Sequence, residues 1–228
     1  CGAAYRDFSA PDSPAEAYRL FRALESDESL RRAESGEAFA VRFAVPPGQT
    51  VAFDDLVFGH IEVESSTLDD FVIRRSDGTP TYHLSVVADD ADMAISHVVR
   101  GADHLSNTPK HVLLFRALGI SVPVFAHLPL ILGPDKKRLS KRHGATSVTE
   151  FAERGLLPEA VRSYIALLGW SPGDDSEVFA GDELVRRFDL ARVNRANAVF
   201  DYSKLEWTNK RFISTASAET LEPYVKET

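Results

Sequence analysis

The chain has 228 residues, 44% hydrophobic and 26% charged, an ordinary composition for a globular protein that excludes a disordered tail. A formal net charge of −8 and a pI near 5.4 exclude indiscriminate coating of nucleic acid, because such binding needs many Lys and Arg side chains. The single cysteine, Cys1, excludes an internal disulfide and a cysteine zinc cluster, and no apolar run approaches the roughly 20 residues of a membrane span, so we expect a cytoplasmic protein.

Residues 1–78 have the patterns of a small α+β unit. The segment "SPAE", residues 13–16, resembles a capping box with proline in the first turn and predicts a helix to about residue 23. Three segments then predict short strands, closed by the turn "SDGTP". These segments are "AFAVRFAVP", "QTVAFDDLVFGHIEV" and "DDFVIRR".

From residue 79 the pattern changes to alternating strands and helices. The segments "TYHLSVVA", "ISHVVRG" and "AHLPLIL" predict strands. Between them "TPKHVLLFRALG" predicts a helix with Thr108 as N-cap, Pro109 in the first turn and Gly119 as the stop. This order is typical of half of a parallel α/β sheet, in which ligands lie beyond the carboxyl ends of the strands.

The remaining segments predict helices. "SVTEFAERG" has a second capping box and ends at Gly155. In "PEAVRSYIALLGW" the apolar positions have helical spacing and predict that Val161, Tyr164, Ile165 and Leu168 lie on one face of a helix. "GDELVRRF" and "SKLEWTNKRFI" complete a helical carboxyl-terminal part, in which we expect Trp170 and Trp207 to be core residues rather than bases for nucleic-acid stacking.

The segment "KKRLSKRHG", residues 136–144, is the basic segment, with five cations in its first seven positions. It follows a predicted strand and is framed by Gly133, Pro134 and Gly144, so its cations can converge on one polyanion such as a triphosphate. A solvated charge run is the alternative that composition alone leaves open.

The common nucleotide-binding signatures are missing. The chain has no G-x-x-x-x-G-K-[ST] and no G-x-G-x-x-G, and "VRGADHLSN" is not followed by D-F-G, which argues against a P-loop enzyme or a kinase. Five histidines lack the spacing of a metal site, so no metal site is predicted. They are His97, His104, His111, His127 and His143.

Four blocks of the chain resemble, in order and spacing, the class I glutamyl-tRNA synthetases. They are "LDDFVIRRSDGTPTYHLSVVADD", "ISHVVRGADHLSNTPKHVLLFRALG", "FAHLPLILGPDKKRLSKRHGATSV" and "LPEAVRSYIALLGWSPGDDSEVF". The resemblance implies an α/β fold, the second half of a Rossmann-like catalytic domain, with an inserted α+β acceptor-binding unit at 1–78. It also implies a catalytic half-domain at 79–135, the loop and a helical stem-contact region at 136–212, and the start of an anticodon-binding region at 213–228.

The family's reaction, which the resemblance implies here, is ATP-dependent ligation of L-glutamate to tRNA through glutamyl-adenylate. ATP is expected as its complex with Mg²⁺, tRNA(Glu) as the acceptor, and tRNA(Gln) as an acceptor left open. The segment "RLSKR" resembles the KMSKS-type signature, which implies catalytic roles for Lys141 and Ser140. The ATP-binding residues implied are Lys141, Arg138, Leu139, Arg142, His104, Leu130 and Ile131.

For glutamate the resemblance implies binding by Tyr82, from the predicted strand "PTYHL", and by Arg100. A planar, bidentate cation suits a dicarboxylic substrate. Each residue also has an ordinary alternative, Tyr82 as an amphipathic strand residue and Arg100 as a surface ion-pair partner. Asp89 and Asp90 are expected to be structural.

The chain departs from the family in lacking the HIGH-type signature, so we expect a fragment that forms no glutamyl-tRNA by itself. Asp7 and Ser9 stand where some relatives have zinc-binding cysteines, so zinc is not expected. A truncated paralogue that binds the tRNA acceptor arm without catalysis is the alternative, and a glutamyl-queuosine-type relative is disfavoured by the stretch beyond Trp170. A monomer with no membrane partner is expected.

Overall fold

A computed structural model describes residues 4–8, 21–140 and 147–226. It divides into two compact units, which we describe separately. The amino-terminal unit comprises Cys1–Asp55, Gly59–Val98 and His104–Phe125, and the carboxyl-terminal unit comprises Leu56–Phe58, Val99–Asp103 and Ala126–Thr228. The helix predicted from "SPAE" lies mostly outside the described residues.

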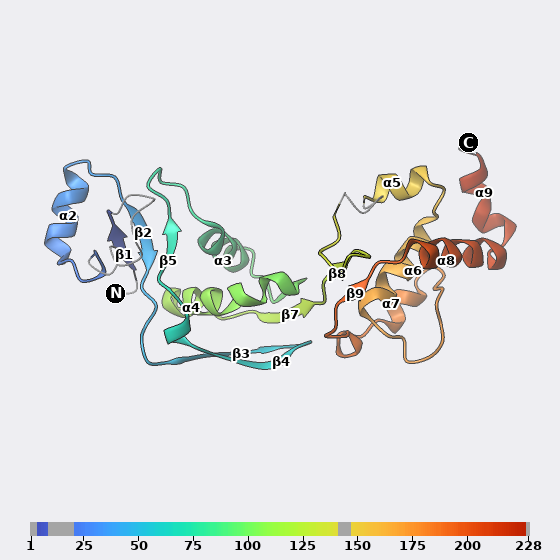
Figure 1. Cartoon of the computed structure of the whole chain (residues 1–228), viewed down its shortest axis with the longest axis horizontal. Helices are drawn as coiled ribbons and strands as arrows, with labels where there is room; N and C mark the ends of the chain where they lie inside the picture. The colour runs from blue at the N-terminus through green and yellow to red at the C-terminus, as the bar shows by residue number, and fades with distance from the viewer. Residues whose placement is uncertain (1–3, 9–20, 141–146, 227–228) are drawn as a thin grey trace. The chain divides into compact units, whose positions relative to one another are not determined.

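The amino-terminal unit contains a three-stranded antiparallel sheet in the order β1-β2-β5 (Figure 1). Its strands are β1 (Ala4–Asp7), β2 (Ala40–Phe43) and β5 (Phe71–Arg74). Buried Asp70 joins the strands, since it accepts hydrogen bonds from the Tyr5 hydroxyl at 3.1 Å and the Val45 amide at 2.8 Å. Burial, and then the Asp70 charge, raise the pKa of Tyr5, which keeps its hydroxyl protonated as a donor.

A second sheet has the order β4-β3-β7-β6, and its hairpin confirms the predicted strands in "QTVAFDDLVFGHIEV". The strands are β3 (Thr50–Asp55), β4 (Gly59–Glu64), β6 (His97–Gly101) and β7 (Val124–Leu128). β3 pairs in parallel with β7 through Asp55 and Phe125, so the sheet is mixed. The fold is therefore the α/β class that the sequence predicts.

The helices of this unit are α2 (Ser26–Glu34), α3 (Tyr82–Asp92) and α4 (Thr108–Leu118), with the 3₁₀ turn η1 (Ser65–Thr67). A second 3₁₀ turn, η2 (Ala102–Asn107), belongs to this unit from His104 onward, while its first two residues belong to the carboxyl-terminal unit. α3 packs against α4. One core lies between these elements and the strands. It consists of Phe43, Val45, Val51, Phe53, Phe71, Val87, Val112, Leu113, Leu114, Phe115 and Phe125.

Two predictions in this unit were wrong. "TYHLSVVA" forms α3 rather than a strand, because Val87 is buried in the core while Val86 and Ala91 pack against it at helical spacing. α4 begins at Thr108, and its N-cap is Asn107. The predicted stop is confirmed, since Gly119 has the left-handed φ of 70° that glycine adopts without a Cβ clash.

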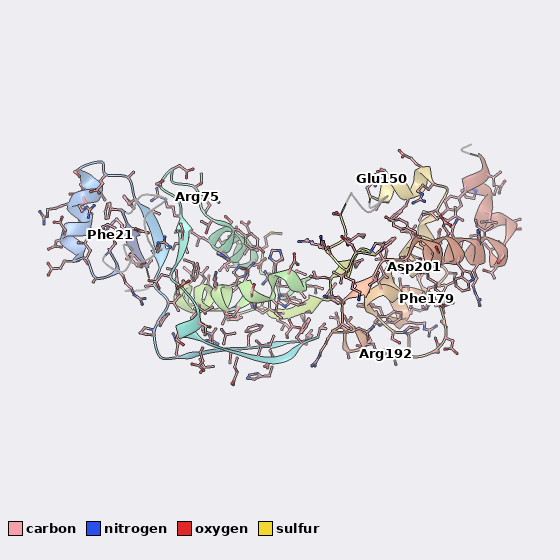
Figure 2. The ribbon with its side chains drawn as sticks, in the orientation of Figure 1. Phe21, Arg75, Glu150, Phe179, Arg192 and Asp201 are labelled. Atoms are coloured by element: carbon pink, nitrogen blue, oxygen red, sulfur yellow. The ribbon has the colours of Figure 1, made fainter. Side chains whose placement is uncertain are left out.

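The carboxyl-terminal unit is mainly helical, as predicted, around a short parallel sheet of β8 (Ile131–Leu132) and β9 (Ala198–Val199). Its helices are α5 (Val148–Glu153), α6 (Pro158–Gly169), α7 (Glu183–Arg187), η4 (Leu190–Arg192), α8 (Tyr202–Thr215) and α9 (Ala218–Lys226). Glu150 and Asp201, labelled in Figure 2, lie at the starts of α5 and α8. The predicted capping box of α5, between Ser147 and Glu150, is confirmed.

The predicted apolar face of α6 is correct at Val161 and Tyr164, which are buried, and at Leu168, which packs against the same cluster. Ile165, the neighbour of Tyr164 in the chain, lies at the edge of this face and is 42% exposed. Two clusters form the core of this unit. They are Phe151, Leu156, Val161, Tyr164, Phe200 and Leu205, and Trp170, Phe179 and Leu184.

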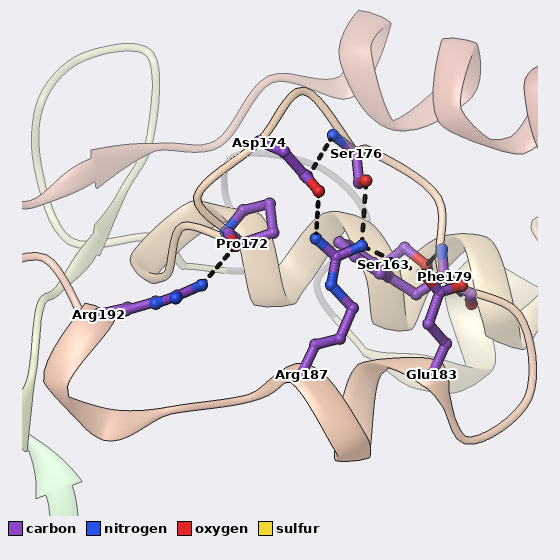
Figure 3. Close-up of polar contacts among 8 residues, drawn as sticks. All are labelled: Ser163, Pro172, Asp174, Ser176, Phe179, Glu183, Arg187 and Arg192. Carbon is purple, nitrogen blue, oxygen red and sulfur yellow. Dashed lines mark hydrogen bonds and ion pairs between the residues drawn. The ribbon is translucent and has the colours of Figure 1, made fainter.

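The loop between α6 and α7 is held by polar contacts (Figure 3). Arg187 pairs with Asp174 at 2.6 Å and donates to the Ser176 hydroxyl at 3.0 Å. Buried Ser163 accepts from the Phe179 amide at 3.1 Å and donates to the Glu159 carbonyl at 2.8 Å. These bonds satisfy backbone groups that burial of Phe179 would otherwise leave unpaired.

Candidate functional site

Tyr82 lies in the first turn of α3, the helix that follows β5 in the chain. Thr81, the N-cap of α3, donates its amide to the Ile73 carbonyl at 2.9 Å and its hydroxyl to the Val72 carbonyl at 2.8 Å. These two bonds fix the start of the helix to the strand. The Tyr82 side chain is thereby held at the surface, 45% exposed.

The Tyr82 hydroxyl lies 3.2 Å from Nδ1 of His104, which is in η2. The Asn107 amide nitrogen lies 3.3 Å from the same Nδ1. Because an amide nitrogen only donates, Nδ1 of His104 accepts and the ring proton is on Nε2. The structure thus brings the predicted glutamate residue Tyr82 and the predicted ATP residue His104 together within the amino-terminal unit.

Two further histidines lie behind Tyr82, and sequence reasoning gave neither of them a role. Nδ1 of His83 lies 3.1 Å from Nε2 of His111, which is buried on α4. The Tyr82 ring centroid is 5.7 Å from each of these imidazole rings. A hydrogen bond between two imidazoles needs one donor and one acceptor, so this bond fixes the orientation of both rings. The Tyr82 ring packs against the two oriented imidazoles.

Arg100, the second predicted glutamate residue, lies on β6. Its Nε donates to Nε2 of fully buried His127 on β7 at 3.1 Å. His127 accepts at Nε2, so it is neutral with its proton on Nδ1. This contact orients the plane of the Arg100 guanidinium, and no sequence signal predicted His127 as its partner.

The base of the basic segment is an antiparallel hairpin in the carboxyl-terminal unit. Leu132 forms a bridge with Arg138, the Leu139 amide donates to the Ile131 carbonyl at 3.0 Å, and the Gly133 amide donates to the Lys137 carbonyl at 2.7 Å. Lys136 has a φ of 59° at the turn. Residues 141–146 lie outside the described residues, so the structure does not place Lys141, Arg142 or His143.

Within the described part of that segment, Arg138 pairs with Asp103 at 2.8 Å. Asp103 follows β6 directly, in η2. Ser140 and Leu139 are half-buried, and Leu139 packs against the cluster around Phe151. Sequence reasoning missed Asp103, although it lies within the quoted block "RGADHL".

Leu130 and Ile131, the other predicted ATP residues, have backbone groups engaged in local pairing. The Leu130 amide donates to Oδ1 of Asn197 at 2.9 Å, and its carbonyl accepts from the Ala198 amide at 3.1 Å. Ile131 pairs with Ala198 in the short sheet. The pairing of β8 with β9 thus fixes the first arm of the hairpin at the base of the basic segment.

The candidate residues are divided between the two units. Tyr82 and His104 belong to the amino-terminal unit, while Arg100, Leu130, Ile131, Arg138, Leu139 and Ser140 belong to the carboxyl-terminal unit. The convergence of the basic segment on Tyr82 and Arg100 stays a prediction. The domain boundaries expected from the sequence also stay predictions.

The two tryptophans differ in burial. Trp170 is 2% exposed among Phe179 and Phe188, which confirms it as core. Trp207 is 39% exposed, so its expected core position was wrong. It lies on α8 between two cations, with Lys204 Nζ 3.9 Å from its ring centroid and Arg211 5.3 Å away.

No metal cluster and no membrane span occurs in the part of the chain that the structure describes. The His, Cys, Asp and Glu side chains there form no group of three or more arranged to hold a metal ion. The helices there lack the combination of length and hydropathy that crossing a bilayer requires.

Residues 5–207 match the family described as tRNA synthetases class I (E and Q), catalytic domain. The chain therefore belongs to the class I tRNA synthetases of the glutamate and glutamine group. Within that group its relatives are glutamate-tRNA ligases. The chain is 52% identical over 207 residues to glutamate-tRNA ligase 2 of Koribacter versatilis, covering 90% of this chain and 43% of that protein.

The same relationship is found with other members. The chain is 48% identical over 200 residues to the glutamate-tRNA ligase of Heliobacterium modesticaldum, covering 88% of this chain and 40% of that protein. A solved glutamate-tRNA ligase from Elizabethkingia meningosepticum, in complex with its amino acid, superposes with a TM-score of 0.86 at 33% identity, covering 99% of this chain and 52% of that one. The chain thus spans about half the length of the relatives that it matches, or less.

Proposed function

We propose that this chain carries part of the catalytic site of a glutamate-tRNA ligase. In the proposed reaction a glutamate α-carboxylate oxygen attacks the α-phosphorus of ATP and pyrophosphate leaves. A hydroxyl of the terminal ribose of tRNA(Glu) then attacks the adenylate carbonyl and AMP leaves. The observation that carries the proposal is the 52% identity to a glutamate-tRNA ligase across 90% of the chain.

For the glutamate substrate we propose two ligands of complementary chemistry. The exposed Tyr82 hydroxyl offers a hydrogen-bonding oxygen, and the Arg100 guanidinium, oriented by His127, supplies a cation. Charge-assisted bonds of this kind contribute about 1.5–3 kcal/mol each. Support comes from the placement of both residues at the ends of secondary-structure elements, where a ligand has access.

For ATP we propose the basic segment, with Lys141 as the cation that stabilises the triphosphate as its charge redistributes. Ser140 supplies a hydroxyl, and Arg142, Leu139, His104, Leu130 and Ile131 complete the proposed ATP contacts. Arg138, the remaining residue that the resemblance implies for ATP, pairs with Asp103. Mg²⁺ is proposed to enter with ATP as part of the substrate complex, where it neutralises phosphate charge. The cations of the segment are the side chains that suit phosphate oxygens.

A truncated, non-catalytic paralogue is not favoured, because the relatives that the chain matches are ligases. Charging of tRNA(Gln) in addition to tRNA(Glu), a monomeric state and a cytoplasmic location are finer proposals. Incubation of the complete gene product with each tRNA separately tests the first of these.

Glutamylation of tRNA tests the proposal. In the complete gene product we expect ATP-dependent glutamylation, and Lys141→Ala to lower kcat on the order of 100-fold or more, the effect of deleting one donor aimed at transition-state charge. Lys110→Ala, which removes a lysine ammonium 5.6 Å from the Phe71 ring, is the matched control and should retain activity. Full activity of Lys141→Ala would remove that residue from its role, and the 228-residue chain alone is predicted to form no glutamyl-tRNA.

A further inference from the structure

The Asp103 carboxylate pairs with one cation and lies close to a glycine. One oxygen pairs with the Arg138 guanidinium at 2.8 Å, and the Asp103 side chain is only 25% exposed although that of Arg138 is 72% exposed. The other oxygen occupies space that a side chain at residue 101 would need. A Cβ built on Gly101 would lie 2.5 Å from Oδ1 of Asp103, closer than real Cβ contacts come.

The hairpin fixes the backbone at Arg138. This residue lies in the second arm of the hairpin at the base of the basic segment, opposite Leu132, and the Leu139 amide binds the Ile131 carbonyl at 3.0 Å. The Asp103 contact joins this arm to the end of β6, the strand that carries Arg100.

We propose that Asp103 is a positioning residue for the described start of the basic segment, residues 136–140, and that Arg138 anchors these residues to Asp103 instead of contacting phosphate. This inference rests on the proposed function, since the same arm carries the proposed ATP contacts Leu139 and Ser140. The physical reason is that the Asp103 carboxylate neutralises the charge of the Arg138 guanidinium, which leaves that guanidinium less attraction for phosphate. Gly101 contributes to this arrangement, because a Cβ at residue 101 would displace the Asp103 carboxylate.

Tryptic cleavage within the segment tests the anchor without requiring activity. Cleavage at a bond in a hairpin requires local opening, so its rate follows the population of the open form. Because an exposed ion pair contributes little, we expect Asp103→Asn to speed cleavage after Lys136, Lys137 and Arg138 by about two- to fivefold. At roughly 1 M NaCl the difference should disappear, since salt screens exposed pairs.

Two further variants make this test specific. Gly101→Ala changes neither partner of the pair, yet it should reproduce the faster cleavage of Asp103→Asn by displacing the carboxylate. Glu206→Gln is the matched control, because it removes a carboxylate from another surface pair of the same unit, 3.7 Å from Arg154. Wild-type cleavage rates in Asp103→Asn and, where it folds, in Gly101→Ala would overturn the proposal.

Kinetics of the complete gene product separate anchoring from direct phosphate binding. We expect Asp103→Asn and Arg138→Ala to lower kcat for glutamylation by a similar two- to fivefold, with the KM for glutamate unchanged, and Arg138→Lys to recover part of the loss. A loss in Arg138→Ala about 100-fold larger than in Asp103→Asn would show a direct role for Arg138 and overturn the proposal. If the wild type forms no glutamyl-tRNA but the cleavage difference holds, the proposed function fails and the anchor stands.

Discussion

At the scale of single residues, Tyr82 shows how a side chain can be exposed and still oriented. Its hydroxyl contacts Nδ1 of His104 at 3.2 Å, and its ring lies against His83 and His111. Rotation of the Tyr82 ring away from His83 and His111 would break these contacts. We therefore expect the hydroxyl to act as a preset hydrogen-bonding group for the glutamate substrate.

Tyr82→Phe tests this at the same scale. Losing a hydrogen bond to a charged group should raise the KM for glutamate by about 10- to 100-fold, with a smaller change in kcat. Steady-state kinetics of tRNA glutamylation by the complete gene product measure both. Tyr224→Phe is the control, because its hydroxyl binds Glu159 at 3.1 Å outside the candidate site. Equal KM values in Tyr82→Phe and the wild type would exclude the role.

The sequence predicted candidate ligands but not the residues that orient them. Tyr82, Arg100 and His104 lie in segments whose residues resemble a known family. Their neighbours His127 and Asp103 lie in the same blocks, but nothing in the pattern identifies them as partners of Arg100 and Arg138. Arg100 and His127 are 27 positions apart, and they meet only because β6 and β7 are neighbours in one sheet. Such a contact depends on strand order, which local pattern does not encode.

At the scale of elements, start and stop signals were more reliable than the choice between strand and helix. The stop at Gly119 and the capping box at Ser147 are where the sequence predicted them. α3 was predicted as a strand because its Tyr and paired Val residues favour strands in isolation. The packing of Val87 in the core favours the helix over the strand.

Asp201→Ala tests the importance of capping for α8. The Asp201 side chain accepts from the amides of Ser203 at 2.8 Å and Lys204 at 3.2 Å, so its loss leaves the first turn without its cap. We expect the free energy of unfolding of the unit to fall by about 0.5–2 kcal/mol in urea titrations. Asp182, the N-cap of α7, makes no side-chain cap bond, so Asp182→Ala should change it much less. Equal losses would contradict this account of α8.

At the scale of the whole molecule, each unit has a core of its own. Phe115 is buried in the core of the amino-terminal unit and Leu205 in that of the carboxyl-terminal unit. Both tryptophans of the chain, Trp170 and Trp207, belong to the carboxyl-terminal unit. Tryptophan fluorescence therefore reports on that unit, while far-ultraviolet circular dichroism reports on both.

We predict that core substitutions separate these signals. Leu205→Ala should cost about 2–5 kcal/mol and lower the urea midpoint seen by tryptophan fluorescence. Phe115→Ala should cost about 3–5 kcal/mol and shift the circular dichroism transition while leaving the fluorescence midpoint nearly unchanged. If both variants shift both signals equally, the units unfold as one and the prediction is wrong.

The sequence by itself determined the class of the fold, the helix stop at Gly119, the capping box at Ser147 and the family, because these depend on local spacing and on blocks of residues in fixed order. Only the tertiary structure decided that Tyr82 begins a helix, that Trp207 is exposed beside Lys204, and that Asp103 holds Arg138. These outcomes depend on which distant surfaces pack together. Burial and pairing between segments are properties of the folded chain, and a linear pattern carries them only indirectly.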